Sequence, residues 1–341
     1  MKIALTGGGT GGHLAIAAAL LEALKSRGHE AIYIGSTSGQ DRAWFENETR
    51  FEKHFFLETS GVVNRQYLGK VWALWKIFRA VIKTRKILKE ERVDVVVSVG
   101  GYSAAAATFA AYTKQIPFFI HEQNAVMGRL NTMMKPYARA FYSSYDEKSP
   151  VSAYPIRDIF FTTARLRKEL KTIVFLGGSQ GAKFINDLAL ETASICIAKG
   201  IKVIHQCGDR DFERVQEAYK SQKIDVELYS FTKELPALIE RADLAVSRAG
   251  ASTLWEVSAN GLPTLFVPYP YAAGDHQFYN AQYLVKKDLA WSYRESDAYS
   301  RNLIAILESD LEEKSSGLML LGHQGGAEEI IKNIEEQMDV S

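Results

Sequence analysis

The chain contains one local pattern twice, about half its length apart: a short apolar run, a glycine-rich turn and a helical stretch. The first copy is residues 3–13, Ile-Ala-Leu-Thr-Gly-Gly-Gly-Thr-Gly-Gly-His, and the second is residues 173–182, Ile-Val-Phe-Leu-Gly-Gly-Ser-Gln-Gly-Ala. Glycines between a strand and a helix let the backbone approach a ligand closely, and the N-terminus of the helix attracts phosphate. The repeat therefore predicts two Rossmann-like domains in tandem.

Short strand-like runs alternate with helical stretches along both halves of the chain. This alternation predicts right-handed βαβ units and an α/β fold with doubly wound, open parallel sheets. The near-continuous apolar run at residues 93–99 is typical of a strand buried on both faces. The stretch 145–167 interrupts the pattern with two prolines and is the expected linker. The expected strands are residues 3–5, 31–34, 93–99, 117–120, 172–176, 202–205, 244–246 and 264–267.

Composition excludes several classes of protein. The 41 Lys and Arg nearly balance the 40 Asp and Glu, so the whole chain carries no signal for nucleic-acid binding. The two cysteines, Cys196 and Cys207, cannot form a disulfide framework, as expected in a reducing compartment. We see no secretory signal and no run of 18 apolar residues, so we expect the protein in the cytoplasm or on the cytoplasmic face of a membrane.

The first glycine-rich turn fits the pattern of a phosphate-binding loop but not that of an NAD site. A dinucleotide site needs an acidic residue at the end of the second strand, where this chain has Gly35, Ser36 and Thr37, with no acid before Asp41. His13 follows in the first turn of the helix. An imidazole titrates near neutral pH, so His13 is a candidate general base. A tight turn without ligand, and a helix-capping or phosphate-contacting His13, remain the alternatives.

Further polar motifs follow the expected strands. Ser179 and its neighbouring N–H groups suit a diphosphate, and Glu256 in the next such helix suits a ribose diol, unless it is an ordinary surface carboxylate. The polar run His121-Glu-Gln-Asn124 ends a strand, where the ligand crevices of parallel sheets lie. The stretch 209–211, Asp-Arg-Asp, resembles a metal motif, but helix capping explains it better. We predict no metal site and no cofactor.

The segment 68–89 interleaves aromatic and basic residues. Trp72, Trp75 and Phe78 alternate with several Lys and Arg side chains, a combination that suits an anionic lipid surface. A helix that covers the sheet and exposes a solvated basic face is the alternative.

Together, the motifs resemble the undecaprenyl-diphospho-muramoylpentapeptide N-acetylglucosaminyltransferases, glycosyltransferase family 28. The resemblance spans about residues 1–285. It implies the GT-B fold, two Rossmann-like domains facing a cleft. It also implies an inverting transfer of GlcNAc from UDP-GlcNAc to lipid I, which gives lipid II for peptidoglycan. The matching motifs are residues 8–13, 100–102, 121–124, 177–182 and 250–256.

The resemblance also assigns roles to single residues. His13 falls at the position of the catalytic histidine, and Thr232 at a main-chain contact to uracil. Tyr102 and Glu122 fall on the acceptor side. Tyr154 departs from the family, which has Asn there. The positions matching the UDP-GlcNAc site are Thr10, Gly11, Gly12, Asn124, Arg157, Ser179, Thr232, Ala251, Ser252, Thr253, Leu254, Trp255, Glu256 and Gln277.

The resemblance implies an organisation and a set of partners. Residues 1–157 would form the acceptor- and membrane-facing domain and residues 158–322 the UDP-GlcNAc domain, with a helix in 323–341 packing back on the first domain. Expected partners are UDP-GlcNAc, lipid I, an anionic membrane surface and other cell-wall synthesis proteins, with no nucleic acid. The protein would be peripheral, on the cytoplasmic face of the membrane.

Two other functions remain open at this point. One is a GT-B glycolipid synthase that uses another lipid acceptor, such as diacylglycerol. The other is a nucleotide-binding protein without transferase activity, which the missing acid after the second strand disfavours.

Overall fold

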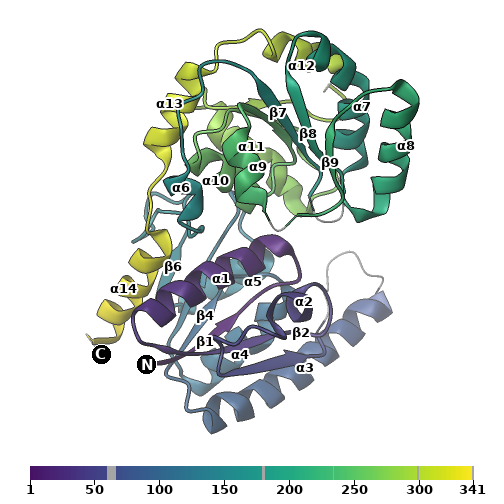
Figure 1. The fold of residues 1–341 in the computed structure, drawn as a ribbon. Coiled ribbons are helices and arrows are strands. Elements are labelled where there is room, and N and C mark those ends of the chain that lie inside the picture. The colour runs from purple at the N-terminus through teal and green to yellow at the C-terminus, as the bar shows by residue number, and fades with distance from the viewer. Residues whose placement is uncertain (60–66, 179–180, 233, 298, 340–341) are drawn as a thin grey trace. The chain divides into compact units, whose positions relative to one another are not determined.

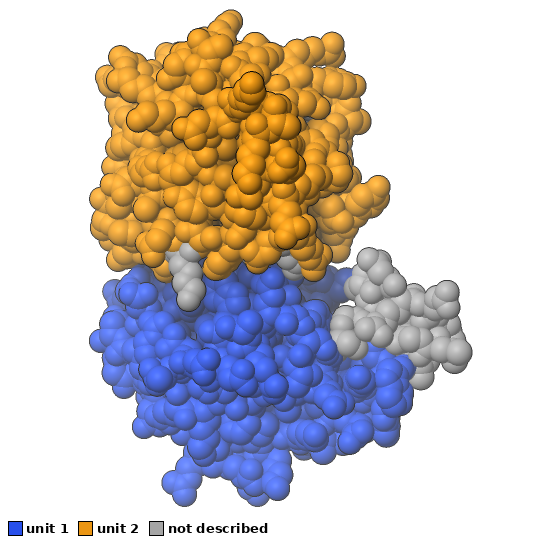
Figure 2. Space-filling model, turned by 45° about the vertical axis from the view of Figure 1, so that its right-hand side comes forward, with its two compact units in different colours: residues 1–156, 325–341 blue, residues 157–324 orange. Residues whose placement is uncertain are grey.

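The computed structural model describes residues 1–59, 67–178, 181–232, 234–297 and 299–339, and side chains from 72 onward in the second range. The chain divides into two compact units (Figure 2). Unit 1 comprises Met1–Ile156 and Gly325–Ser341, and unit 2 comprises Arg157–Gln324. The division therefore lies within one or two residues of the expected domain boundaries.

Unit 1 is built on a six-stranded parallel sheet in the order β3-β2-β1-β4-β5-β6. The strand order reverses between β1 and β4, which creates a topological switch point at their carboxyl ends. Residues Val95, Val96 and Val97 of β4 are fully buried, as the continuous apolar run predicts. The strands are β1 (Lys2–Thr6), β2 (Glu30–Ser36), β3 (Lys53–Leu57), β4 (Val95–Ser98), β5 (Phe118–His121) and β6 (Ala140–Tyr142).

Helices cover both faces of this sheet (Figure 1). On one face, α3 (Tyr67–Glu90), α4 (Ala105–Lys114) and α5 (Arg129–Met134) bury an apolar cluster with alternate strand residues such as Ala4 and Val96. On the other face lies α1 (Gly11–Ser26). The C-terminal helix α14 (Gly326–Asp339) packs beside α1, where Glu335 accepts hydrogen bonds from Arg27 and pairs with His29. The short elements are α2 (Asp41–Phe45), η1 (Tyr102–Ala104) and η2 (Lys135–Tyr137).

Unit 2 repeats the arrangement with the order β12-β11-β10-β7-β8-β9. Its strands are β7 (Thr172–Leu176), β8 (Lys202–Gln206), β9 (Glu227–Tyr229), β10 (Leu244–Ser247), β11 (Thr264–Phe266) and β12 (Trp291–Ser292). Its helices are α6 (Ile159–Thr162), α7 (Lys183–Ala198), α8 (Phe212–Gln222), α9 (Leu235–Arg241), α10 (Ala251–Ala259), α11 (His276–Val285), α12 (Ser300–Ile306) and α13 (Glu312–Leu321), with the short turns η3 (Asp209–Asp211) and η4 (Ala273–Asp275).

The second half of the expected linker belongs to unit 2, and its buried Arg167 anchors it there. The guanidinium of Arg167 is fully buried and donates to the carbonyl oxygens of Arg165 (2.7 Å), Ala242 (3.2 Å) and Ile239 (3.2 Å), and to Asn260. Burial lowers the pKa of Arg167 to about 9. Because this buried cation ties its segment to the C-terminal ends of α9 and α10, residues 157–167 belong to unit 2 and cannot serve as a linker, and the prediction was wrong there.

The two parallel sheets confirm the predicted pair of Rossmann-like domains. All eight expected strands are present, and each of their ends lies within two residues of the expected one. The four missed strands, β3, β6, β9 and β12, are the edge strands of the two sheets. None of the helices in the described ranges has the length and apolar character needed to cross a bilayer.

Candidate active site

The predicted site residues gather at the carboxyl ends of the central strands of each unit. In unit 1 they follow β1, β4 and β5, and in unit 2 most of them follow β7, β10 and β11, while Thr232 follows the edge strand β9. Open parallel sheets bind ligands at this edge, beside the switch point. Each unit is therefore described at this edge in turn.

The first glycine loop packs directly on the loop that follows β4. Gly8 N donates to Gly100 O (3.2 Å), and a Cβ on Gly101 would lie only 2.3 Å from Gly8 O. Gly7 and Gly9 have φ values of 129° and 84°, which L side chains rarely adopt. The two loops can approach this closely because both are made of glycine.

Asp41 stabilises the first glycine loop through hydrogen bonds. Its carboxylate is fully buried and accepts hydrogen bonds from Gly9 N (2.6 Å), Ser36 N (3.0 Å) and the Tyr33 hydroxyl (3.2 Å). The carboxylate points at the chain itself and is not presented to a ribose, which agrees with the argument against an NAD site. Sequence reasoning noticed Asp41 only as the first acid after the second strand, because its contacts are tertiary.

His13 lies among polar side chains at the start of α1. Its Nδ1 is 2.8 Å from Thr10 Oγ1, and its Nε2 accepts a hydrogen bond from Gln123 Nε2 (3.0 Å). A Cβ on Gly100 would lie 3.4 Å from His13 Nε2 and 3.3 Å from Asn131 Nδ2, so these groups are neighbours. The neutral ring then carries its proton on Nδ1, and the Nε2 lone pair is the one that can take up a proton. Gln123 and Asn131 were not among the predicted site residues.

Glu122 organises the loop after β5. Its buried carboxylate accepts hydrogen bonds from Asn124 N (3.0 Å), Gly128 N (2.8 Å) and Asn131 Nδ2 (2.9 Å). The chain itself therefore engages both oxygens of Glu122. Its predicted place on the acceptor side stays a prediction, but the contacts indicate that Glu122 shapes the loop that carries Asn124.

His121 is buried beside this cluster and stays neutral. Burial and, to a lesser degree, the charge of His13 lower the pKa of His121 to about 3. Within the described part of the chain, neither of its ring nitrogens has a hydrogen-bond partner, and its ring packs edge-on against Tyr154. His121 is thus a packed, uncharged ring at any ordinary working pH.

Tyr102 closes the glycine loop from the side of η1. Its hydroxyl donates to Ser38 O (2.8 Å), and a Cβ on Gly9 would lie 2.6 Å from its ring. Burial raises the pKa of Tyr102.

A hollow of about 470 Å³ opens at the carboxyl ends of β5 and β6. Its lining includes Glu122, Asn124, Met127, Ser143 and Tyr145.

In unit 2, the second glycine loop follows β7 and leads into α7. Gly177 N donates to Gln206 O (2.7 Å), and a Cβ on Gly181 would lie 2.8 Å from Cys207 O. This loop therefore lies against the end of β8, just as the first loop lies against the loop that follows β4. Ser179, the residue predicted to contact the diphosphate, lies outside the described residues.

The side chain of Glu256 on α10 is buried, and its surroundings shift the pKa of its carboxyl group. Burial raises the pKa of Glu256 to about 7, while the positive charge of Arg157 acts in the opposite direction. Trp255 packs against the Tyr283 ring (5.7 Å between centroids), and Leu254 is fully buried. The side chains of Leu254 and Trp255 therefore belong to the core, and only their backbone can contribute to a site in the first turn of α10, together with Ala251, Ser252 and Thr253.

Gln277 and Thr232 have local hydrogen bonds. Gln277 Oε1 accepts from Tyr269 N (2.9 Å), and Thr232 Oγ1 accepts from Glu234 N (2.9 Å). The contact with Glu234 N uses one acceptor position of the Thr232 hydroxyl, and the main-chain role of Thr232 stays a prediction.

The Asp-Arg-Asp motif does not cap α8 through a side chain. Asp211 occupies the N-cap position of α8 without making a side-chain cap, and instead pairs with Arg214 and accepts from Asn186 Nδ2 (2.7 Å). The expected helix capping was therefore wrong. The described residues contain no group of three or more His, Cys, Asp or Glu arranged to hold a metal ion.

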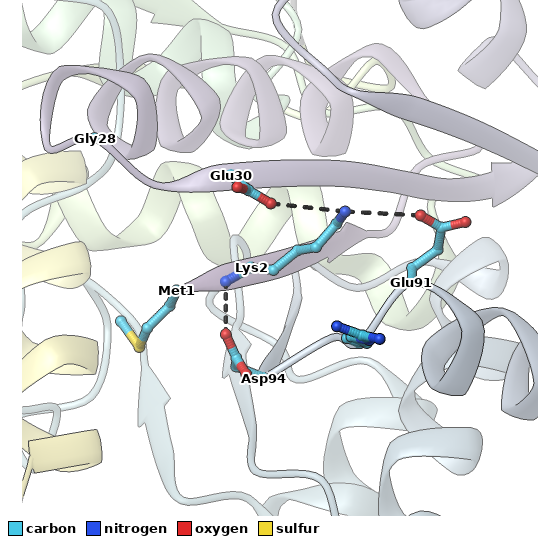
Figure 3. Close-up of a pocket in the computed structure, with 7 residues that line it drawn as sticks. Met1, Lys2, Gly28, Glu30, Glu91 and Asp94 are labelled. Atoms are coloured by element: carbon cyan, nitrogen blue, oxygen red, sulfur yellow. Dashed lines mark hydrogen bonds and ion pairs between the residues drawn. The ribbon is translucent and has the colours of Figure 1, made fainter.

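A second hollow lies at the opposite edge of the unit 1 sheet. Its volume is about 380 Å³, and Figure 3 shows Lys2 between the carboxylates of Glu30 and Glu91, with Asp94 accepting from the Lys2 backbone N–H. These charges satisfy one another at the amino ends of the strands, away from the glycine loop. We therefore assign no part of the candidate site to this hollow.

Comparison with known proteins gives one family over both units. The profile of the glycosyltransferase family 28 N-terminal domain matches residues 3–143, and that of the C-terminal domain matches residues 172–336. A curated relative from Sulfurimonas denitrificans is 54% identical over 98% of both chains, and one from Campylobacter jejuni is 48% identical over 97% of both. Both are named UDP-N-acetylglucosamine--N-acetylmuramyl-(pentapeptide) pyrophosphoryl-undecaprenol N-acetylglucosamine transferase.

Solved structures agree on the fold. The crystal structure of Acinetobacter baumannii MurG matches with a TM-score of 0.80 at 24% identity, covering 98% of this chain and 99% of that one. The Streptomyces glycosyltransferase SsfS6 in complex with thymidine diphosphate matches with a TM-score of 0.68 at 14% identity, over 98% and 99% of the chains. The fold is thus GT-B, as predicted. Since two profiles cover most of both units and close relatives align over nearly the full length, the chain belongs to glycosyltransferase family 28.

Proposed function

We propose that the chain transfers GlcNAc from UDP-GlcNAc to the muramoyl sugar of undecaprenyl-diphospho-MurNAc-pentapeptide, lipid I, and so makes lipid II for peptidoglycan. The observation that carries this proposal is the near-full-length identity of about half to relatives named for this reaction. The geometry adds two glycine loops at the carboxyl ends of the strands of two Rossmann-like sheets, where open parallel sheets bind nucleotides.

The reaction is a single displacement at C1 of GlcNAc. The acceptor 4-hydroxyl oxygen forms the new bond to C1, and the bond from C1 to the diphosphate oxygen breaks and releases UDP. One displacement converts the α-linked donor sugar into a β-linked product. The hydroxyl proton passes to His13 Nε2, which must exchange its hydrogen bond from Gln123 for the acceptor hydroxyl.

Negative charge grows on the diphosphate as the sugar leaves. The N–H groups of residues 179–182, which precede α7 in the sequence, and the guanidinium of Arg157 are the groups proposed to stabilise it. Arg157 is exposed, and its guanidinium lies 5.4 Å from the centroid of the Phe160 ring. Donors already in place stabilise the developing charge without a reorganisation cost.

The remaining donor contacts are assigned by chemistry. Glu256 accepts the two hydroxyls of the ribose, the backbone of Thr232 contacts uracil, and Gln277 reads sugar hydroxyls. Residues 251–255 supply backbone contacts in the first turn of α10. Thr10, Gly11, Gly12 and Asn124 complete the proposed donor set from unit 1.

Helix α3 has two distinct faces, and we assign the outer one to the membrane. Its buried residues, Ala73, Ala80, Thr84 and Leu88, are small or aliphatic and line the side packed on the unit. The opposite side exposes half or more of several large apolar residues, and Trp75 stacks on Phe78. These side chains are Trp72, Leu74, Trp75, Phe78 and Ile82.

Cations accompany these exposed side chains. Arg79, Lys83, Arg85 and Lys86 are exposed on the same helix, and Lys76 lies over the Trp72 ring. Each cation near an anionic lipid surface contributes about 1 kcal/mol of attraction. The alternatives considered for this segment are therefore compatible, because the inner face covers the unit while the outer face binds lipid. This face would hold the protein peripherally on the cytoplasmic side, where lipid I is the acceptor.

The activity is tested with the full chain, labelled UDP-GlcNAc and a polyprenyl-diphosphate muramoyl pentapeptide. We expect label in the lipid product and release of UDP in equal amounts. Diacylglycerol serves as the second acceptor. Transfer to diacylglycerol alone would establish the glycolipid-synthase alternative, and failure to label either acceptor would contradict a transferase.

Replacing His13 tests the base. His13→Gln should lower kcat by about 10²–10⁴-fold, the usual contribution of a general base, with little change in donor KM. His323→Gln, on an exposed histidine of unit 2, is the matched control. A kcat for His13→Gln near that of the control would remove His13 from the role.

The ribose contact of Glu256 predicts a pH dependence of uridine binding. Only the carboxylate accepts both hydroxyl protons, so affinity should rise as pH increases through the pKa of about 7. Between pH 6 and pH 8 the gain should be about tenfold, with net proton release on binding. Uridine lacks phosphate and so isolates this contact in calorimetry.

Glu256→Gln should remove that pH dependence, whereas Glu191→Gln, on an exposed glutamate of α7, should keep it. A slope that persists in Glu256→Gln would assign the titration to another group and end the ribose assignment.

Membrane contact is measured by co-sedimentation with phosphatidylglycerol vesicles. The double variant Trp72→Ala/Phe78→Ala should bind the vesicles at least about fivefold more weakly because it loses the apolar contact. High salt should also weaken the binding of the unaltered protein to the vesicles, because it screens the attraction between the cations and the lipid. Trp44→Ala/Phe231→Ala, which removes two exposed aromatic residues elsewhere, is the control. Equal loss in both double variants would argue against a role specific to α3.

A further inference from the structure

Gln206 ends β8 at the point where the second glycine loop passes. Strand β8 pairs with β7, and Gln206 is opposite Leu176, the last residue before the loop. The Gln206 side chain is buried. In dinucleotide-binding domains the end of the equivalent strand carries an acid that is presented to the ribose. Here the same place holds an amide that is turned toward the chain itself.

The amide of Gln206 makes three hydrogen bonds to backbone atoms. Oε1 accepts from Gly178 N (2.9 Å), and Nε2 donates to Gly178 O (3.0 Å). Nε2 also donates to Ser230 O (2.9 Å). A side-chain amide has a donor and an acceptor side by side, so it can engage the N–H and the C=O of one residue together.

These contacts join two segments that are far apart in the sequence. Gly178 belongs to the loop proposed to hold the diphosphate, and its φ of 75° is in the left-handed region. Ser230 is two residues before Thr232, the residue proposed to contact uracil through its backbone. The two ends of a nucleoside diphosphate would therefore meet segments that a single side chain holds together.

We propose that Gln206 is a positioning residue, which fixes the Gly178 loop relative to the Ser230 segment at the spacing that a nucleoside diphosphate needs. This role rests on the proposed function of unit 2 as the UDP-GlcNAc site. A loop that is already ordered binds its ligand without the entropic cost of ordering it. Gln206 itself touches neither the sugar nor the reacting atoms.

The test compares UDP with uridine, because only UDP reaches the diphosphate loop. In Gln206→Met the side chain keeps its length and loses all three hydrogen bonds. We expect UDP to bind about tenfold more weakly, the effect of losing roughly one net hydrogen bond, and uridine affinity to stay within about twofold. The donor KM should rise by the same factor as the UDP Kd, while kcat at saturating donor stays close to that of the unaltered protein.

Two further variants make the measurement specific. Gln206→Glu keeps the acceptor for Gly178 N but sets an oxygen against the carbonyls of Gly178 and Ser230, so UDP binding should weaken at least as much. This variant also keeps the test open if Gln206→Met does not fold. Gln222→Met, on an exposed residue at the end of α8, is the matched control and should bind UDP normally.

The outcomes separate this role from the proposed function. If the unaltered protein binds no UDP, the proposed function is overturned and this role with it. If the unaltered protein binds UDP and both Gln206 variants bind it equally well, only the positioning role is overturned. Equal losses of UDP and uridine affinity would also contradict the role, because they would indicate general damage to unit 2.

Discussion

Each glycine loop of this protein is held by its hydrogen bonds with one buried side chain, and the rest of the candidate site depends on these contacts. Asp41 accepts from Gly9 N in unit 1, and Gln206 engages both polar groups of Gly178 in unit 2. A loop of glycines has many conformations available, so an unsupported loop would lose conformational entropy when a ligand binds, and this loss would weaken binding. The two units thus solve the same problem alike, with a carboxylate in one and an amide in the other.

The difference between the two braces has a physical reason. Asp41 meets three donors, from Gly9, Ser36 and Tyr33, which a carboxylate can accept together. Gln206 meets one N–H and two carbonyl oxygens, which require a donor as well as an acceptor. A carboxylate at position 206, like the one of Asp41 in unit 1, would also place negative charge near the proposed diphosphate. The neutral amide avoids that repulsion.

The sequence predicts the central strands and the motifs, but not the edge strands or the side chains that hold the glycine loops. The fully buried strand β4 gives a continuous apolar signal, whereas the edge strands β9 and β12 are short and half-exposed, so no pattern distinguishes them from loops. Asp41 and Gln206 act through tertiary contacts, which residue spacing does not reveal. Leu254 and Trp255 fall within a recognisable motif, yet their side chains are core, because a motif identifies a segment and not the direction of each side chain.

Three titratable side chains meet at the carboxyl edge of unit 1, and their surroundings separate their roles. His121 is neutral because burial lowers its pKa to about 3, so it cannot take up a proton near neutral pH. Glu122 accepts from three of the chain's own donors, and freeing an oxygen would disrupt the loop that carries Asn124. His13 has its Nε2 lone pair against one N–H of the Gln123 amide, a donor that a hydroxyl could replace. Of the three, His13 is therefore the side chain best suited to accept the proton of an incoming hydroxyl.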